Sequence, residues 1–316
     1  MIRSILSRLA LLVGGLLVAS VLIFVALRIA PGDVAQVIAG SEATPAQVEA
    51  IRASMGLDRS LLTQYLEWVG GFIRGDLGRS MITGAPVIDE LREKAEVTVP
   101  LTALALGIAI VFAVPTGIIA ALARRRAAGT ILSIGAQLTA AVPILWAGML
   151  LILLFSMTLG WFPPQGFPRG GWEQPGDALR ALVLPALAIG LVEGALIMRF
   201  VRSATLDALG QEHVLAGAAR GSTRLSALLR HGLPSVGLSI VSILGVQVAG
   251  LIVGAVIVEQ LFTLPGIGRM LVTDVGNRDL VAVQSELLIL TAVVLIVGAL
   301  VDIVHRTLDP RQRVRV

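Results

Sequence analysis

Three polar side chains inside long apolar runs are the residues of this chain most able to act on a solute. Glu193 interrupts the apolar segment 181–201, and Gln137 and Gln247 lie within two other apolar runs. A polar group at that depth in a membrane costs free energy, so it marks either a pathway through the protein or a hydrogen bond between packed helices. Both interpretations stay open for all three residues.

Other groups that could support catalysis or cofactor binding do not form a recognisable site in the sequence. The chain has no cysteine, which excludes thiol nucleophiles, disulfides and cysteine-ligated metals. His213, His231 and His305 are too scattered to indicate a metal site. Lys94 is the only lysine, and no glycine-rich turn of the kind found in a P-loop precedes it. We therefore expect no enzyme activity and no cofactor or metal in this chain.

The composition is that of a membrane protein. Hydrophobic residues make up 56% of the chain and charged residues only 15%, whereas about a quarter of a soluble protein is charged. About 20 apolar residues in a helix cross the hydrocarbon core of a bilayer. We expect an all-α membrane protein with six transmembrane helices, at about 1–30, 97–123, 130–158, 180–201, 233–258 and 286–304.

Arginines indicate how these helices are oriented. They gather at one set of helix ends, at Arg3 and Arg8, at 124–126, at 199–230 and at 306–315. The positive-inside rule places that side, together with both termini, in the cytoplasm. The same distribution accounts for the pI of about 10.8, so we expect no binding of nucleic acid. The first apolar run is longer than that of a signal peptide and has no convincing cleavage site, which favours a retained membrane anchor.

The outer segment 31–96, with six basic and ten acidic residues, has the pattern of soluble helices. Thr44 and Gln47 form a predicted capping box, and Gly56 suits the end of that helix. A second helix is expected over 60–73 from its apolar spacing. The amphipathic stretch 86–96 is either a helix lying on the membrane surface or an ordinary solvent-exposed helix.

Small residues at helical spacing predict close packing between spans. Gly190 is followed four residues later by Gly194, and Gly250 by Gly254. Such pairs allow helix backbones to approach each other in lipid. Near the last span, Asp302 and Arg306 are also four residues apart, which favours a local ion pair.

The cytoplasmic connection 207–234 is the most informative segment for function. Residues 212–220 are rich in helix formers, and Gly221 is suited to end that helix. Val214, Leu215 and Ala218 would form one small apolar face. A short helix of this kind can press into a groove of a soluble partner. The alternative is an interfacial helix that has no partner.

Several motifs of this chain, taken together and in order, resemble the permeases of ATP-binding-cassette (ABC) importers, most closely those of the oligopeptide, dipeptide and nickel branch. The coupling-loop signature of that family is similar to Ala218-Ala219-Arg220-Gly221, followed by Leu228-Leu229-Arg230-His231 and Pro234. The glutamate that opens the signature in the wider superfamily is absent, because Leu215-Ala216-Gly217 stands there, and the peptide branch commonly lacks it too. Further segments that resemble the branch are Leu27-Arg28-Ile29-Ala30-Pro31-Gly32-Asp33, Met55-Gly56-Leu57-Asp58, Gln64-Tyr65-Leu66, Arg74-Gly75-Asp76-Leu77-Gly78-Arg79-Ser80, Pro143 with Trp146, Val258-Glu259 with Pro265-Gly266-Ile267-Gly268, Arg278-Asp279 with Gln284, and Leu308-Asp309-Pro310-Arg311.

The resemblance implies a type I importer permease fold in a bacterial cytoplasmic membrane. It implies an N-terminal transmembrane helix at 1–30, an extracytoplasmic helical insertion at 31–96, a permease core at 97–306 with a coupling loop at 202–231, and a cytoplasmic tail at 307–316. The implied partners are a homologous second permease, two ATPase subunits or one fused ATPase that bind ATP and Mg²⁺, and an extracytoplasmic binding protein. The implied contacts with the ATPase are Glu212, Val214, Leu215, Ala216, Gly217, Ala218, Ala219, Arg220 and Gly221.

The resemblance favours di- and oligopeptides as substrates. Nickel, glutathione, opines or sugars remain alternatives, because the separate binding protein does most of the selecting in this family. A stand-alone secondary transporter is a further alternative, but it should show inverted repeats with broken helices, and no convincing repeat is present. An intramembrane enzyme would need paired carboxylates, a metal site or a serine-based dyad within the spans.

Overall fold

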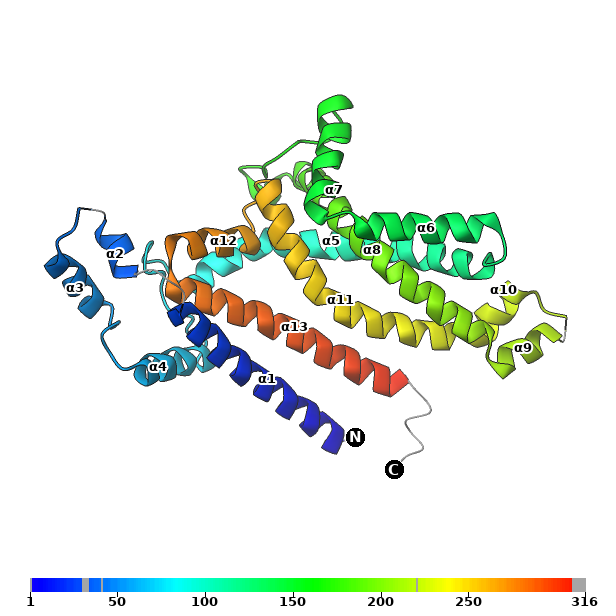
Figure 1. Ribbon diagram of the computed structural model, residues 1–316, viewed down its shortest axis with the longest axis horizontal. Coiled ribbons are helices and arrows are strands. Elements are labelled where there is room, and N and C mark those ends of the chain that lie inside the picture. The colour runs from blue at the N-terminus through cyan, green and yellow to red at the C-terminus, as the bar shows by residue number, and fades with distance from the viewer. Residues whose placement is uncertain (1, 30–33, 41, 220, 309–316) are drawn as a thin grey trace. The chain divides into compact units, whose positions relative to one another are not determined.

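Helices are the regular secondary structure of the part of the chain that the computed structural model describes, residues 2–29, 34–40, 42–219 and 221–308 (Figure 1). Over those residues the only β-type pairing is an isolated bridge between Arg79 and Pro86. The all-α membrane fold expected from the sequence is therefore confirmed. The chain divides into two compact units, Met1–Thr98 with Pro265–Ile296 and Val99–Leu264 with Val297–Val316.

Five helical segments are long and apolar enough to cross a membrane: Ser7–Ile29, Val87–Leu122, Pro175–Leu209, Leu225–Leu261 and Leu280–His305. A sixth crossing is available only if a bent helix pair, Ala127–Ala141 with Ile144–Thr158, counts as one span. These helices fall where the sequence predicts spans. Several of them extend beyond the predicted ends because polar residues continue the same helix outside the apolar run.

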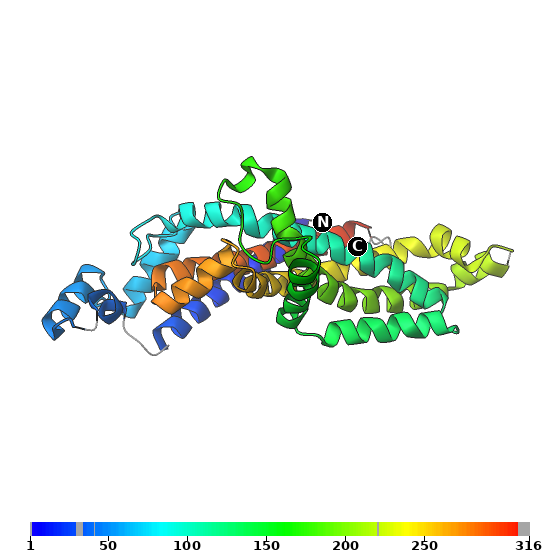
Figure 2. The ribbon, with the colours of Figure 1, turned by 90° about the horizontal axis from the view of Figure 1, so that it is seen from above.

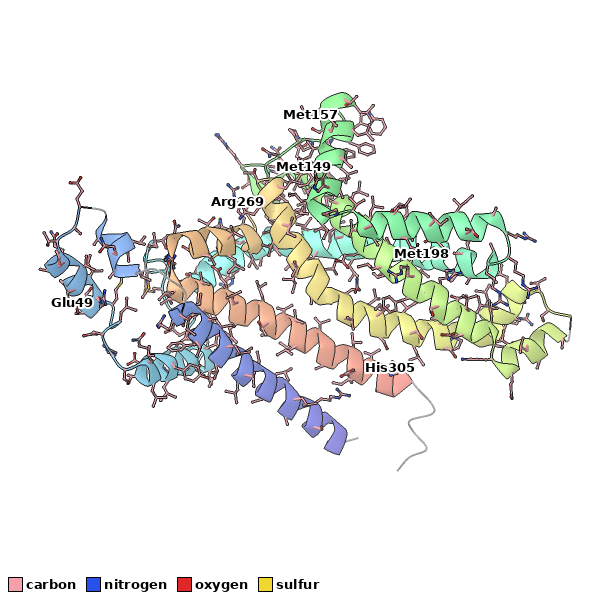
Figure 3. All side chains as sticks on the ribbon, viewed as in Figure 1. Glu49, Met149, Met157, Met198, Arg269 and His305 are labelled. Carbon is pink, nitrogen blue, oxygen red and sulfur yellow. The ribbon has the colours of Figure 1, made fainter. Side chains whose placement is uncertain are left out.

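The segment predicted as one helix over 130–158 is instead bent by 100°. Helix α6 (Ala127–Ala141) ends before Pro143, and α7 (Ile144–Leu151) starts after it and continues as the π-helical turn η1 (Ile152–Thr158). Proline has no N–H to continue the helical ladder, and it disfavours helical backbone at the residue before it. Val142 accordingly adopts an extended conformation, with φ −78° and ψ 123°. Met149 and Met157, labelled in Figure 3, mark the arm beyond the bend.

The first unit combines the N-terminal helices with two elements near the C-terminus. Its elements are α1 (Ile2–Ile29), α2 (Val34–Ala39), α3 (Pro45–Ser54), α4 (Leu61–Ile73), the start of α5 (Val87–Leu122), α12 (Ile267–Asn277) and the start of α13 (Leu280–Leu308). Leu77, Val87, Leu91, Ile267 and Ala282 form its buried apolar cluster. The backbone N–H of Ile267 donates to Thr98 Oγ1 at 2.8 Å, which ties the start of α12 to α5.

The helix caps predicted for the outer segment are confirmed. Gln47 and Thr44 exchange both bonds of a capping box at the start of α3. Gly56 follows the α3 cap with a φ of +66°, a conformation that glycine adopts without strain. Ser60 caps α4 by accepting a hydrogen bond from the Thr63 N–H. The amphipathic stretch 86–96 is not a separate helix, because residues from Val87 onward belong to α5.

In the second unit, α8 (Pro175–Leu209) is the most buried helix, and its glycines permit close contact with its neighbours. A Cβ placed on Gly190 would lie 2.7 Å from the Ala105 carbonyl oxygen of α5, and one on Gly194 would lie 3.2 Å from Ala109 Cα. Met198 of α8, labelled in Figure 3, belongs to the same buried cluster as alanines of α5. Helix α11 (Leu233–Leu261) also packs on α8. The predicted small-residue contacts are thus confirmed.

Candidate functional site

The connection between α8 and α11 folds into a compact helical loop. Helix α8 ends at Leu209, and the loop then consists of α9 (Glu212–Ala219), α10 (Arg224–Ala227) and the π-helical turn η3 (Leu228–Gly232) that leads into α11. Both views place α9 and α10 beside the joined ends of α8 and α11 (Figures 1 and 2). Gly221 has a φ of +91°, so the chain reverses there through a conformation that side-chain-bearing residues rarely adopt.

One face of α9 is fixed against the loop itself. Val214 is only 2% exposed, and an added Cβ on Gly232 would lie 3.5 Å from Val214 Cγ2. Gly217 is buried as well, and a Cβ there would lie 3.1 Å from His231 Cδ2. Ala208, Leu228 and Val236 form the buried apolar cluster of this region. This inner face packs α9 against α10, η3 and the end of α8.

The other face of α9 is uncovered. Leu215 is 54% exposed, and Ala216, Ala219 and Glu212 are exposed as well. An exposed leucine flanked by alanines is a small, flat apolar surface of the kind that enters a groove on another protein. The loop thus separates residues that support α9 from residues that are free to contact a partner.

The residues predicted for this site do not all share one face. The sequence pattern grouped Val214 with Leu215, whereas the structure turns Val214 inward and Leu215 outward. Neighbouring residues of a helix are about 100° apart, so the two side chains diverge once Val214 is packed. Arg220 lies outside the described residues, and the same holds for the side chain of Ala218.

Two of the three polar residues predicted within the spans form one interhelical contact. Gln247 Nε2 of α11 donates a hydrogen bond to the Glu193 carboxylate of α8. Glu193 is 6% exposed, and an added Cβ on Gly250 would lie 2.8 Å from its Oε1, so the absence of a side chain at Gly250 makes room for the carboxylate. Gln137 is exposed on α6 and takes no part in this hydrogen bond. Of the two interpretations left open by the sequence, a pathway or a hydrogen bond between packed helices, the structure supports the second for Glu193 and Gln247.

A second group of buried acids lies in the first unit and was not predicted. Asp279 is fully buried and accepts hydrogen bonds from Ser80 Oγ at 2.6 Å and from the Ala282 N–H at 3.1 Å. Glu286 is also fully buried, but neither of its carboxylate oxygens has a donor among the described residues. The Asp274 carboxyl group lies beside it, and burial raises the pKa of Asp274.

This acidic group does not have the composition of a metal centre. Among the described residues, no set of three or more histidine, aspartate, glutamate or cysteine side chains is arranged to hold a metal ion. The only sequence signal for the group was the excess of acids in the short connection 259–286. That excess agrees with the orientation expected from the arginines, but it does not show that the carboxyl groups meet.

Two family models match this chain and together cover most of it. The model for the inner membrane component of binding-protein-dependent transport systems matches residues 113–314, and the model for the N-terminal region of the same membrane component matches residues 1–102. The chain belongs to this family of ABC importer permeases. It is therefore a multi-pass inner-membrane permease component, a class of subunit that is not itself catalytic.

Relatives of this importer permease match it from end to end. A Brucella abortus protein assigned to a peptide transport system as its permease is 35% identical over 309 residues, which are 98% of each chain. The glutathione transport system permease protein GsiC of Escherichia coli is 33% identical over 313 residues, which are 99% of each chain. The resemblance noted from the coupling-loop and outer-segment motifs is thus confirmed at the level of the family.

Proposed function

We propose that this permease forms half of the pathway by which an ATP-driven importer takes up di- or oligopeptides, and that α9 couples it to an ATPase. The full importer would contain a homologous second permease, two ATPase subunits or one fused ATPase, and an extracytoplasmic binding protein. ATP and Mg²⁺ bind to the ATPase partners and not to this chain.

The outward face of α9 is the observation that carries the coupling proposal. Leu215, Ala216 and Ala219 are exposed there, while Val214 and Gly217 pack against η3 and α10. A rigid mounting matters because a force applied to a loosely held loop would deform the loop rather than move the spans. Because α9 packs on α8 and on η3, which continues into α11, closure of the ATPases would move α8 and α11 as well.

The coupling works only if the two nucleotide states of the ATPases contact α9 differently. A partner shifts a conformational equilibrium by its difference in affinity for the two states, and by no more than that. Binding of ATP would favour one opening of the pathway, and hydrolysis would favour the other. In this scheme the hydrogen bond between Gln247 and Glu193 keeps α8 and α11 together as one body.

Peptides are the proposed substrates, and glutathione is the second candidate. The Brucella abortus relative is assigned to peptide transport, and the Escherichia coli relative to transport of glutathione, which is itself a tripeptide. The two relatives are similarly identical to this chain, so identity alone does not separate the two solutes. Nickel and other small solutes of the same branch are less favoured, because neither relative carries such a name.

The substrate is tested by uptake into proteoliposomes that contain the permease pair, the ATPases and the binding protein. We expect saturable uptake of radiolabelled trialanine that requires ATP in the lumen of the proteoliposomes. Glutathione should compete with trialanine less strongly than unlabelled trialanine does, and Ni²⁺ should not compete. Uptake of glutathione without any uptake of trialanine would instead favour the second candidate. Uptake by the permease alone, without ATP or partners, would overturn the proposal in favour of a secondary transporter.

A further inference from the structure

The first unit contains a cavity that neither the coupling loop nor the interhelical contact uses. Its volume is about 290 Å³, and it lies between the outer end of α1, the turn between α3 and α4, α4 itself, and the start of α13. Polar and charged side chains line much of it, notably Arg28, Arg59, Gln64, Glu67, Asp76 and Gln284. The volume is close to the lower end of the range for small-molecule sites, about 300 Å³.

Arg28 is held at this cavity with part of its hydrogen-bonding capacity unused. Its guanidinium carbon lies 4.7 Å from the centre of the Phe24 ring, and its Nη2 donates to Gln64 Oε1 at 2.6 Å. Its Nη1 is buried and has no acceptor among the described residues. A buried donor without an acceptor costs free energy, and more so when it carries charge. The side chain is therefore positioned for an acceptor that the described residues do not provide.

The neighbouring polar groups are engaged with partners other than Arg28 Nη1. Arg59 Nη1 engages both carboxylate oxygens of Glu67, at 2.8 Å and 3.1 Å. Asp76 Oδ1 accepts from the Gly78 N–H at 2.9 Å. Gln64 is fixed because its Nε2 donates to the carbonyl oxygens of Leu57 and Arg59. Of the two described arginines that line the cavity, Arg59 thus has a carboxylate partner and Arg28 has none.

We propose that this cavity is a binding site for a single carboxylate, held by the Arg28 guanidinium. The planar fork of an arginine matches the two oxygens of a carboxylate and forms a strong charge-assisted contact with it. A doubly charged phosphate would suit the site less well, because Glu67 and Asp76 also line the cavity and would repel it. One bound monoanion would complete the hydrogen bonding of Nη1 and neutralise Arg28.

The carboxylate has two possible sources that share this chemistry. It is either the C-terminal carboxylate of a short peptide or an acidic side chain of the binding protein that docks on the outer face. These two sources rest on the proposed function, whereas the carboxylate chemistry rests on Arg28 alone. The test therefore has one arm for each source and uses no ATP, so that its result is independent of coupling through α9.

In the first arm, the full-length permease pair in lipid nanodiscs is titrated calorimetrically with N-acetyl-dialanine and with the same compound as its C-terminal amide. In the second arm, the affinity of the nanodiscs for the binding protein is measured. Both arms compare the wild type with Arg28→Gln and with the control Arg92→Gln, which changes an exposed arginine of the same unit that does not line the cavity.

If the carboxylate belongs to the substrate, N-acetyl-dialanine should bind and its amide should not. Arg28→Gln should then weaken binding roughly tenfold or more, as expected for a lost charged hydrogen bond. If the carboxylate belongs to the binding protein, Arg28→Gln should weaken the affinity for the binding protein by a similar factor in the second arm. N-acetyl-dialanine should then not bind in the first arm. Either result supports the site, provided that Arg92→Gln behaves as wild type. Equal affinities of wild type and Arg28→Gln in both arms would overturn it.

Discussion

Substitution of Leu215 by aspartate should abolish ATP-driven uptake while the permease still folds and inserts. Leu215 is 54% exposed on α9 and has few contacts to lose within its own chain. In the coupled complex, however, the carboxylate would enter an interface and lose its water. An unpaired charge in a protein interface costs about 3–5 kcal/mol, which corresponds to docking weakened by roughly a hundredfold or more.

The measurement is transport together with ATPase activity in proteoliposomes of the assembled importer. We expect Leu215→Asp to lose uptake and to lose the stimulation of ATP hydrolysis by loaded binding protein. The matched control is Leu215→Met, which keeps an apolar side chain of similar volume and should retain both activities. Wild-type uptake by Leu215→Asp would show that the outward face of α9 does not contact the ATPase.

Gly190→Ala should lower the stability of the permease more than alanine substitution at any freely exposed glycine of the same unit. The new Cβ would lie 2.7 Å from the Ala105 carbonyl oxygen and 2.8 Å from Ile108 Cγ2, so the α5 backbone would have to move. Overpacking of this kind costs about 1–3 kcal/mol. Because α8 is the most buried helix of its unit, the displacement would also disturb its packing against α11.

The melting temperature of the purified protein in detergent measures this effect. Alanine substitutions at two other glycines serve as references for its size. Gly107→Ala adds the same methyl group to α5 where no atom lies within 4 Å, and it should leave the melting temperature unchanged. Gly250→Ala meets only the flexible end of Glu193, at 2.8 Å, and should have an intermediate effect. If the Gly190→Ala and Gly107→Ala variants have the same melting temperature, then α5 and α8 are not packed as closely as described.

Much of this architecture could be predicted from the sequence because it depends on local rules. The capping box of Thr44 and Gln47, the helix end at Gly56 and the short helix that begins at Glu212 all follow from residues close together in the chain. The glycine pairs predicted contacts between helices because a residue without a side chain permits close approach at any position. They could not predict which neighbour each glycine would meet.

Other features depend on tertiary packing, and sequence patterns could not predict them. The apolar run around Pro143 continues on both sides, so hydropathy indicated one span where the structure has two helices at 100°. The inward turn of Val214 depends on Gly232, which comes later in the chain. The contact of Asp274 with Glu286 brings together two helices whose relative position is not encoded in local spacing.

The central claim, that the outward face of α9 lies in the cytoplasm and is covered by an ATPase, can be tested with a single thiol. The chain has no cysteine, so Leu215→Cys introduces a unique site for a membrane-impermeant maleimide. The control is Leu62→Cys, which replaces another exposed leucine, 67% accessible, in the outer insertion. Each variant is labelled in sealed right-side-out and inside-out vesicles, with and without the ATPases.

We expect the Leu215→Cys variant to be labelled only in inside-out vesicles, and its labelling rate to fall several-fold when the ATPases are bound. The Leu62→Cys variant should be labelled only in right-side-out vesicles, at a rate that the ATPases do not change. Labelling of position 215 from the outside, or at the same rate with and without the ATPases, would contradict the account.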